Sequence, residues 1–112
     1  MGKNLCYVYV NTASYLGGVV CKIGISNNIE KRIREFNTGL RCRARYYNDI
    51  TGVEFKNAYK KPMDRLIAKL VEKECHKKIK DKLIKEMGNE VFDIDPKTAI
   101  SLLRKTIKEV VA

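Results

Sequence analysis

The stretch VVCKIGISNNIEKRIREFNTG, residues 19–39, predicts a strand, a glycine turn and a helix in immediate succession. Residues 19–24 are rich in β-branched types, which favour a buried strand. Asn27, with Glu30 three residues later, is typical of a helix N-terminus, and Gly39 stands where a left-handed residue would end the helix. Apolar residues recur between these ends at helical spacing, as Ile29, Ile33 and Phe36.

The segments on either side of this stretch predict two further strands. Residues 5–10, LCYVYV, combine β-branched and aromatic side chains. The loop that follows them is short enough for an antiparallel hairpin with residues 19–24. Residues 42–57 predict a third strand, bent around residues 48–52, because suitable side chains recur there as Tyr46, Tyr47, Val53 and Phe55.

The C-terminal half is predicted to be helical. A long helix should begin at Pro62, a residue that suits a first helical position, and end at Gly88. Residues 89–94 predict a short extended segment, after which Asp95 should cap a last helix. The length of 112 residues and the absence of repeats or linkers indicate one domain over residues 1–112. The predicted class is α+β, with a small antiparallel three-stranded sheet flanked by helices.

The charge balance points to a polyanionic partner. Lysine and arginine number 23 against 13 acidic residues, which gives a formal net charge of +10. Nucleic acid is the first expectation and an anionic membrane surface the second, whereas a merely lysine-rich surface is the structural alternative. No apolar run is long enough to span a membrane. The N-terminus does not resemble a secretory signal, so we expect an intracellular protein that is not secreted.

Cysteine usage argues against a zinc site or a disulfide framework. The four cysteines include no C-x-x-C pair, and the chain has a single histidine. Together with the missing secretory signal, this predicts reduced and mostly buried thiols, at Cys6, Cys21, Cys42 and Cys75.

Three groups of residues are candidates for chemistry, and each also has a structural explanation. Tyr7 and Tyr9 are two residues apart and share one face of their strand; the structural alternative is that aromatic residues simply favour sheets. Lys22 and Arg32 flank the glycine turn, and either could be a solvated charge. The third group is Glu72 and His76, which lie four residues apart on one helical face. Their structural explanation is a hydrogen bond between the two side chains at the margin of the core.

Taken together and in order, these segments resemble the GIY-YIG nuclease superfamily. YVY at residues 7–9 resembles its first motif and KIG at residues 22–24 its second. The helix carrying Arg32 and the segment AKLVEKECH at residues 68–76 are similar to the two helical motifs that follow. GNEVFDI at residues 88–94 resembles the closing element of a phage-associated branch, in which lysine is common in place of the first tyrosine of the second motif.

The resemblance implies single-metal hydrolysis of DNA phosphodiester bonds. Glu72 would bind the cofactor, Mg²⁺ or Mn²⁺, since one carboxylate with waters and phosphate oxygens suffices for Mg²⁺. Arg32 would contact the scissile phosphate. Tyr9 beside Lys22 would act as general base, with Tyr7 as the alternative first-motif tyrosine. His76 would orient the metal-binding glutamate or contact DNA.

Partners and rival functions complete the expectations. DNA phosphates would be contacted by Lys22 and Arg32, and also by exposed cations of two helices, Arg34, Lys69 and Lys73. The lysine in the second motif equally fits a catalytically weak or inactive nucleic-acid-binding or regulatory protein with the nuclease fold. A third alternative is an interaction module, in which the amphipathic C-terminal helix forms a homo-oligomer.

Overall fold

A computed structural model describes residues 5–46 and 50–112, and its architecture starts from a long hairpin. Strands β1 (Leu5–Tyr15) and β2 (Gly18–Ser26) pair antiparallel from Tyr7 opposite Ser26 to Tyr15 opposite Gly18. The turn between them contains Leu16 and Gly17, both with positive φ, as a tight two-residue hairpin turn requires. Both strands are longer than predicted, because most of residues 11–18, which were expected to form a loop, belong to the strands and only Leu16 and Gly17 form the turn.

The sheet has four strands within the described residues. Strand β3 (Lys56–Asp64) pairs with β1, and the short β4 (Val91–Phe92) pairs with β2, giving the antiparallel order β3-β1-β2-β4. The predicted α+β class and antiparallel sheet are confirmed, with β4 added inside the segment expected only to be extended. The third strand was predicted at residues 42–57, but β3 begins only at Lys56, so the two overlap at residues 56–57 alone. Tyr47 of that prediction falls outside the described residues.

Helix α1 (Ile29–Arg43) begins and ends later than predicted. Its N-cap is Asn28, whose side chain accepts a hydrogen bond from the Lys31 amide at 3.1 Å, and not Asn27. Gly39 does not end the helix, because the next residue, Leu40, is buried and holds a further turn against the core.

The long C-terminal helix predicted from residue 62 is shorter and broken. Pro62 belongs to β3, an outer strand where the missing amide hydrogen is tolerated. Helix α2 (Arg65–Lys78) begins after Asp64, which accepts from the Leu66 amide, and two 3₁₀ turns follow, η2 (Lys80–Lys82) and η3 (Lys85–Met87). Helix α3 (Pro96–Val111) starts at its predicted cap.

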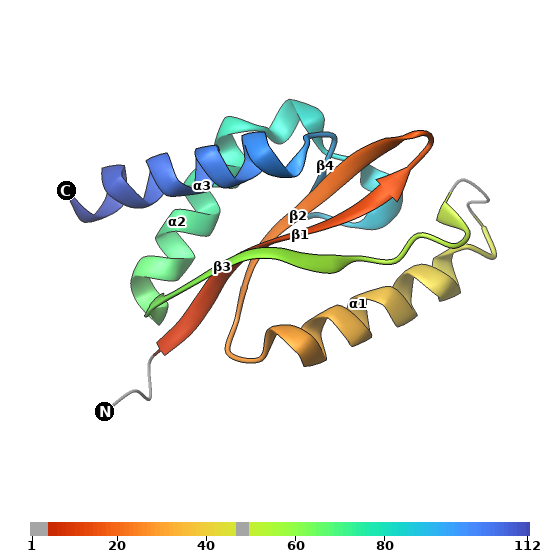
Figure 1. Cartoon of the computed structure of the whole chain (residues 1–112), viewed down its shortest axis with the longest axis horizontal. Coiled ribbons are helices and arrows are strands. Elements are labelled where there is room, and N and C mark those ends of the chain that lie inside the picture. The colour runs from red at the N-terminus through yellow and green to blue at the C-terminus, as the bar shows by residue number, and fades with distance from the viewer. Residues whose placement is uncertain (1–4, 47–49) are drawn as a thin grey trace.

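The helices divide between the two faces of the sheet. Helices α2 and α3 pack on the face that carries Val8, Val10 and Ile23, whereas α1 and the η3 turn cover the face that carries Ala13 and Val20. Figure 1 shows α1 on one side of the strands and α2 with α3 on the other. Cys6, Cys21 and Cys75 are buried and Cys42 is exposed, in keeping with the predicted free thiols. In the described part of the chain, no helix has the length and apolar character needed to cross a membrane.

Candidate active site

The site forms where the outer edge of β2 is left open by its short neighbour. Strand β4 pairs with Cys21 and Lys22, and the ladder ends there. Beyond this point the Ile23 amide donates to the Glu90 carbonyl at 3.2 Å, and the Ile23 carbonyl lies 2.7 Å from His76 Nε2. Side chains from α1, α2 and the segment before β4 can therefore meet at this edge.

Lys22 is the buried centre of the site. Its side chain lies on the α1 face of the sheet, and the residue is 2% exposed. Lys22 Nζ donates to Tyr9 Oη at 2.5 Å and forms an ion pair with Glu90 Oε1 at 3.1 Å. It also stands 4.8 Å above the ring of Phe36 of α1. A buried cation is tolerated only when it is paired and hydrogen-bonded, and these neighbours provide both conditions.

Gly24 leaves the space that Tyr9 and Glu90 occupy. A Cβ atom at residue 24 would lie 2.6 Å from Tyr9 Oη and 3.2 Å from Glu90 Oε1. The backbone at residue 24 needs no left-handed conformation, since its φ is not among the positive values. The glycine of the K-I-G motif is thus required by a close approach of side chains and not by a turn.

Arg32 faces this cluster from α1. A pocket of about 200 Å³ is lined by Lys22, Arg32, Phe36, Asn89 and Glu90. The arginine is exposed, so its guanidinium can reach a ligand phosphate with two hydrogen bonds. The pocket consequently joins an exposed cation to a buried one, which favours an anionic ligand.

Glu72 of α2 completes the site. The pKa of its carboxyl is raised to about 7, chiefly by burial and next by the neighbouring Glu90 carboxylate, while Lys22 and Arg32 act in the opposite direction. Two adjacent carboxylates are hard oxygen donors of the kind that Mg²⁺ prefers. The described residues include no group of three or more potential metal-ligating side chains. The rest of the shell would consist of water and phosphate oxygens, which suits Mg²⁺ and not zinc.

His76 lies at the site but contacts the backbone. Its Nε2 donates to the Ile23 carbonyl, and its ring centroid lies 5.1 Å from that of Phe92. The expected contact with Glu72 is not among its described contacts. The histidine thus satisfies a strand-edge carbonyl that β4 is too short to reach.

Replacing His76 should therefore affect stability. His76→Ala leaves the Ile23 carbonyl without its donor, and we expect the free energy of unfolding to fall by about 1–3 kcal/mol. His76→Gln keeps an N–H donor and should recover part of this loss. Urea unfolding measures both variants, and an unchanged free energy in His76→Ala would contradict the assignment.

Other predicted residues lie outside the cluster. Tyr7 is half-buried and lies opposite Ser26, two residues before Tyr9 on β1, with Lys60 Nζ 5.4 Å from its ring centroid. Three further cations are exposed on their helices and do not line the pocket: Arg34, Lys69 and Lys73. Their contact with DNA stays a prediction.

Three residues of the site were not predicted to take part in chemistry. Glu90 and Asn89 lie in GNEVFDI, a segment that the sequence singled out without assigning a role to any residue in it. Phe36 was assigned to the apolar stripe of its helix. The acidic side chain of Glu90, next to a short extended segment, was the available signal in the sequence. The ion pair between Glu90 and Lys22, however, depends on the pairing of β4 with β2, which the sequence did not predict.

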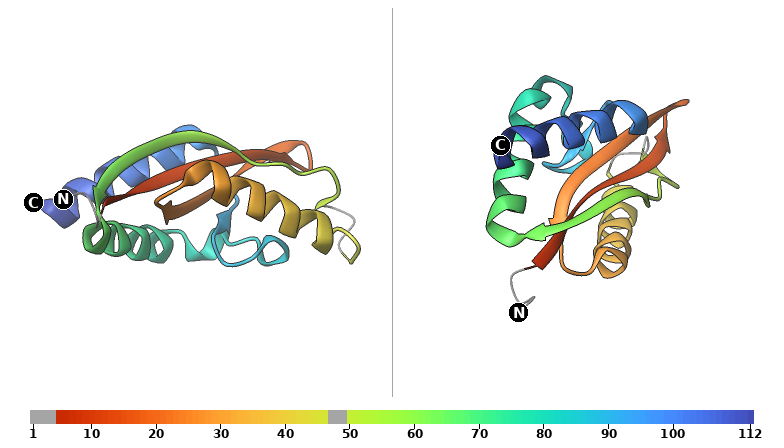
Figure 2. Two further views of the ribbon diagram at one scale, coloured as in Figure 1. Left: turned by 90° about the horizontal axis from the view of Figure 1, so that it is seen from below. Right: turned by 60° about the vertical axis from the view of Figure 1, so that its left-hand side comes forward.

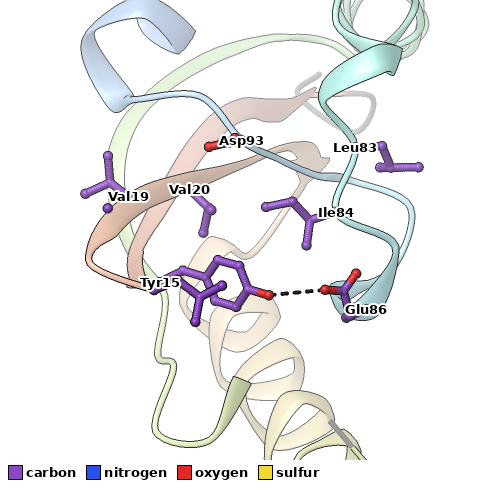
Figure 3. Close-up of a pocket in the computed structure, with 9 residues that line it drawn as sticks. Tyr15, Val19, Val20, Leu83, Ile84, Glu86 and Asp93 are labelled. Carbon is purple, nitrogen blue, oxygen red and sulfur yellow. Dashed lines mark hydrogen bonds between the residues drawn. The ribbon is translucent and has the colours of Figure 1, made fainter. Parts of the chain in front are cut away.

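A larger cavity lies at the far end of the hairpin and has a different character. It measures about 430 Å³, and Figure 3 shows Tyr15 pointing across it toward Glu86, with a hydrogen bond of 3.2 Å from Tyr15 Oη to Glu86 Oε2. Its charged lining residues are acidic, Glu86 and Asp93. A pocket without a lining cation is poorly suited to a phosphate, so size does not identify the functional site here.

Comparison with known proteins identifies a family for most of the chain. The family model described as T5orf172 domain matches residues 6–109. Neither the curated proteins nor the solved structures give a match. The matched region contains every residue of the cluster around Lys22.

Proposed function

Because the chain belongs to the T5orf172 domain family, which is related to the GIY-YIG nucleases, we propose that it is a small metal-dependent endonuclease. Its substrate would be DNA and its reaction the hydrolysis of a phosphodiester bond. The observation that carries the proposal is the convergence of Lys22, Arg32, Glu72 and Glu90 at one strand edge. Two cations beside two carboxylates can hold a phosphate and a divalent metal together.

Each side chain has a task in this reaction. Arg32 would bind the scissile phosphate and offset the negative charge that grows on it. Glu72, supported by Glu90, would hold Mg²⁺, which when bound polarises the phosphate and stabilises the leaving oxygen. Lys22 would add a fixed positive charge from a site shielded from water, where its interaction with the phosphate is stronger than in bulk solvent.

The proton of the attacking water needs an acceptor. The resemblance gives this role to Tyr9, but its side chain is fully buried and its hydroxyl is covered by Lys22. Glu90 faces the pocket with 31% of its side chain exposed. We therefore assign proton acceptance to Glu90, and assign to Tyr9 the positioning of Lys22.

Plasmid nicking tests the proposal. The wild-type protein should nick supercoiled DNA with Mg²⁺ and not with EDTA, and Arg32→Ala should lower the rate by about 10²–10³-fold, as loss of a transition-state contact does. Arg34→Ala is the matched control, because it removes an exposed arginine of the same helix that does not line the pocket. It should change the rate by less than about tenfold.

The outcome also separates the rival function. Salt-sensitive DNA binding without cleavage by Mg²⁺ or Mn²⁺ would overturn the nuclease proposal and favour a binding or regulatory protein with the same fold. Equal nicking by wild type, Arg32→Ala and Arg34→Ala would indicate a contaminating nuclease.

A further inference from the structure

A second basic pocket lies between β3 and α3, away from the cluster around Lys22. It is lined by Tyr59, Lys61, Arg104, Ile107 and Lys108. Tyr59 packs on the core face that α2 and α3 cover, and Ile107 belongs to the same core. Figures 1 and 2 show α1, which carries Arg32, on the other side of the sheet from α3. The two basic pockets are therefore on different faces of the molecule.

The three cations of this pocket have no acidic counterparts. Four ion pairs occur among the described residues, and none includes Lys61, Arg104 or Lys108. The lining contains no carboxylate. Arg104 and Lys108 are four residues apart on one helix face, where like charges repel each other. An anion that bound between these residues would relieve the repulsion.

Protection of an outer strand does not explain this arrangement. Lysines on edge strands such as β3 prevent pairing with other sheets, and Lys61 alone could serve that purpose. Arg104 and Lys108 come from α3, a helix that needs no such protection, and yet they converge with Lys61 on one hollow. The convergence of cations from two elements favours a binding site.

The volume of the pocket limits the size of the ligand that it can bind. It measures about 140 Å³, which exceeds the ~30 Å³ occupied by a water molecule but falls below the roughly 300 Å³ typical of small-molecule sites. A phosphate group fits this range. Lysine, arginine and tyrosine side chains are all common donors to backbone phosphates of nucleic acids.

We propose that this pocket binds a backbone phosphate of a second nucleic-acid segment, separate from the segment at the cluster around Lys22. The choice of nucleic acid as the ligand rests on the proposed function. The molecule extends 42 × 28 × 18 Å, whereas duplex DNA stays straight over about 500 Å. A single rigid duplex cannot follow both faces of so small a body. The substrate class would be branched or flexible nucleic acid, or two duplexes held together.

A bridging assay tests this inference in EDTA, so that cleavage is not needed. Beads carrying one short duplex are incubated with the protein and then with a second, fluorescent duplex. Wild type should retain the second duplex, and the triple variant Lys61→Gln/Arg104→Gln/Lys108→Gln should lose it. The salt dependence of binding should also fall, by about 1 to 2 in the slope of log K against log salt.

The control removes the same charge elsewhere. Lys80→Gln/Lys82→Gln/Lys97→Gln alters exposed lysines that line neither basic pocket, and should keep both the bridging and the slope. Equal behaviour of the two triple variants, or no bridging by wild type, would overturn the inference. Nicking by wild type without bridging would overturn this inference and leave the nuclease proposal intact. Bridging without nicking would overturn the nuclease proposal and leave this inference intact.

Discussion

Glu72→Gln should abolish Mg²⁺-dependent cleavage and at the same time stabilise the metal-free protein above pH 7. The amide has the shape of the carboxylate but cannot hold the metal as strongly, and we expect the nicking rate to fall by at least about 10²–10³-fold. The half-buried carboxylate also lies beside Glu90, so its negative charge is unfavourable when no metal is present. The neutral amide removes that cost.

The sign of the stability effect follows from the pKa of Glu72. Its carboxyl has a pKa of about 7 in the folded protein against 4.5 as the ordinary value. A raised pKa favours the protonated folded state, so stability is fully present below about pH 4.5 and is lost as the pH rises to about 7. Thermal unfolding in EDTA should therefore show similar melting temperatures for wild type and Glu72→Gln at pH 4, and a higher one for the variant at pH 8.

The matched control is Glu74→Gln, on the same helix. Glu74 pairs with Lys77 at 3.5 Å on the outer surface and does not line the pocket. The Glu74→Gln variant should keep nearly wild-type cleavage and show no gain in stability at pH 8, since surface ion pairs contribute little to stability. A Glu72→Gln variant that still cleaves with Mg²⁺, or melts like wild type at every pH, would contradict the assignment of this carboxylate.

Gly24→Ala should be the second large change, and it adds a single methyl group. The new Cβ would lie 2.6 Å from Tyr9 Oη, a distance that forces the tyrosine or the strand to move. Overpacking of this kind costs about 1–3 kcal/mol. Because Tyr9 holds Lys22, and Lys22 holds Glu90, we expect cleavage to fall by about 10²-fold, as small displacements of catalytic groups do.

Gly39→Ala provides the control for the same substitution. Gly39 lies inside α1, and apart from its chain neighbours and the adjacent helix backbone no atom lies within 4 Å of the added Cβ. Alanine favours a helix over glycine by about 1 kcal/mol, so this variant should be more stable than wild type and keep its activity. Urea unfolding and nicking rates measure both variants. Wild-type activity in Gly24→Ala would show that the contact with Tyr9 is not needed.

The sequence by itself determined the local features of this protein. Its alternating and helical patterns gave the first two strands, the cap of the last helix at Asp95 and the α+β class. It also singled out Tyr9, Lys22, Arg32 and Glu72, which the structure brings to one place. The strands and the cap depend on residues close together in the chain, where propensity and spacing act directly. The four site residues were singled out by the resemblance of the ordered motifs to a known family.

The tertiary structure alone decided which strand edge stays open and what gathers there. Pro62 entered a strand and Gly39 stayed in a helix because pairing with Tyr7 and burial of Leu40 outweighed local propensity. Glu90 reached Lys22 because β4 is only two residues long and places the preceding carboxylate over Gly24. Such contacts join segments 60 or more residues apart, so their energy depends on packing that no local pattern records.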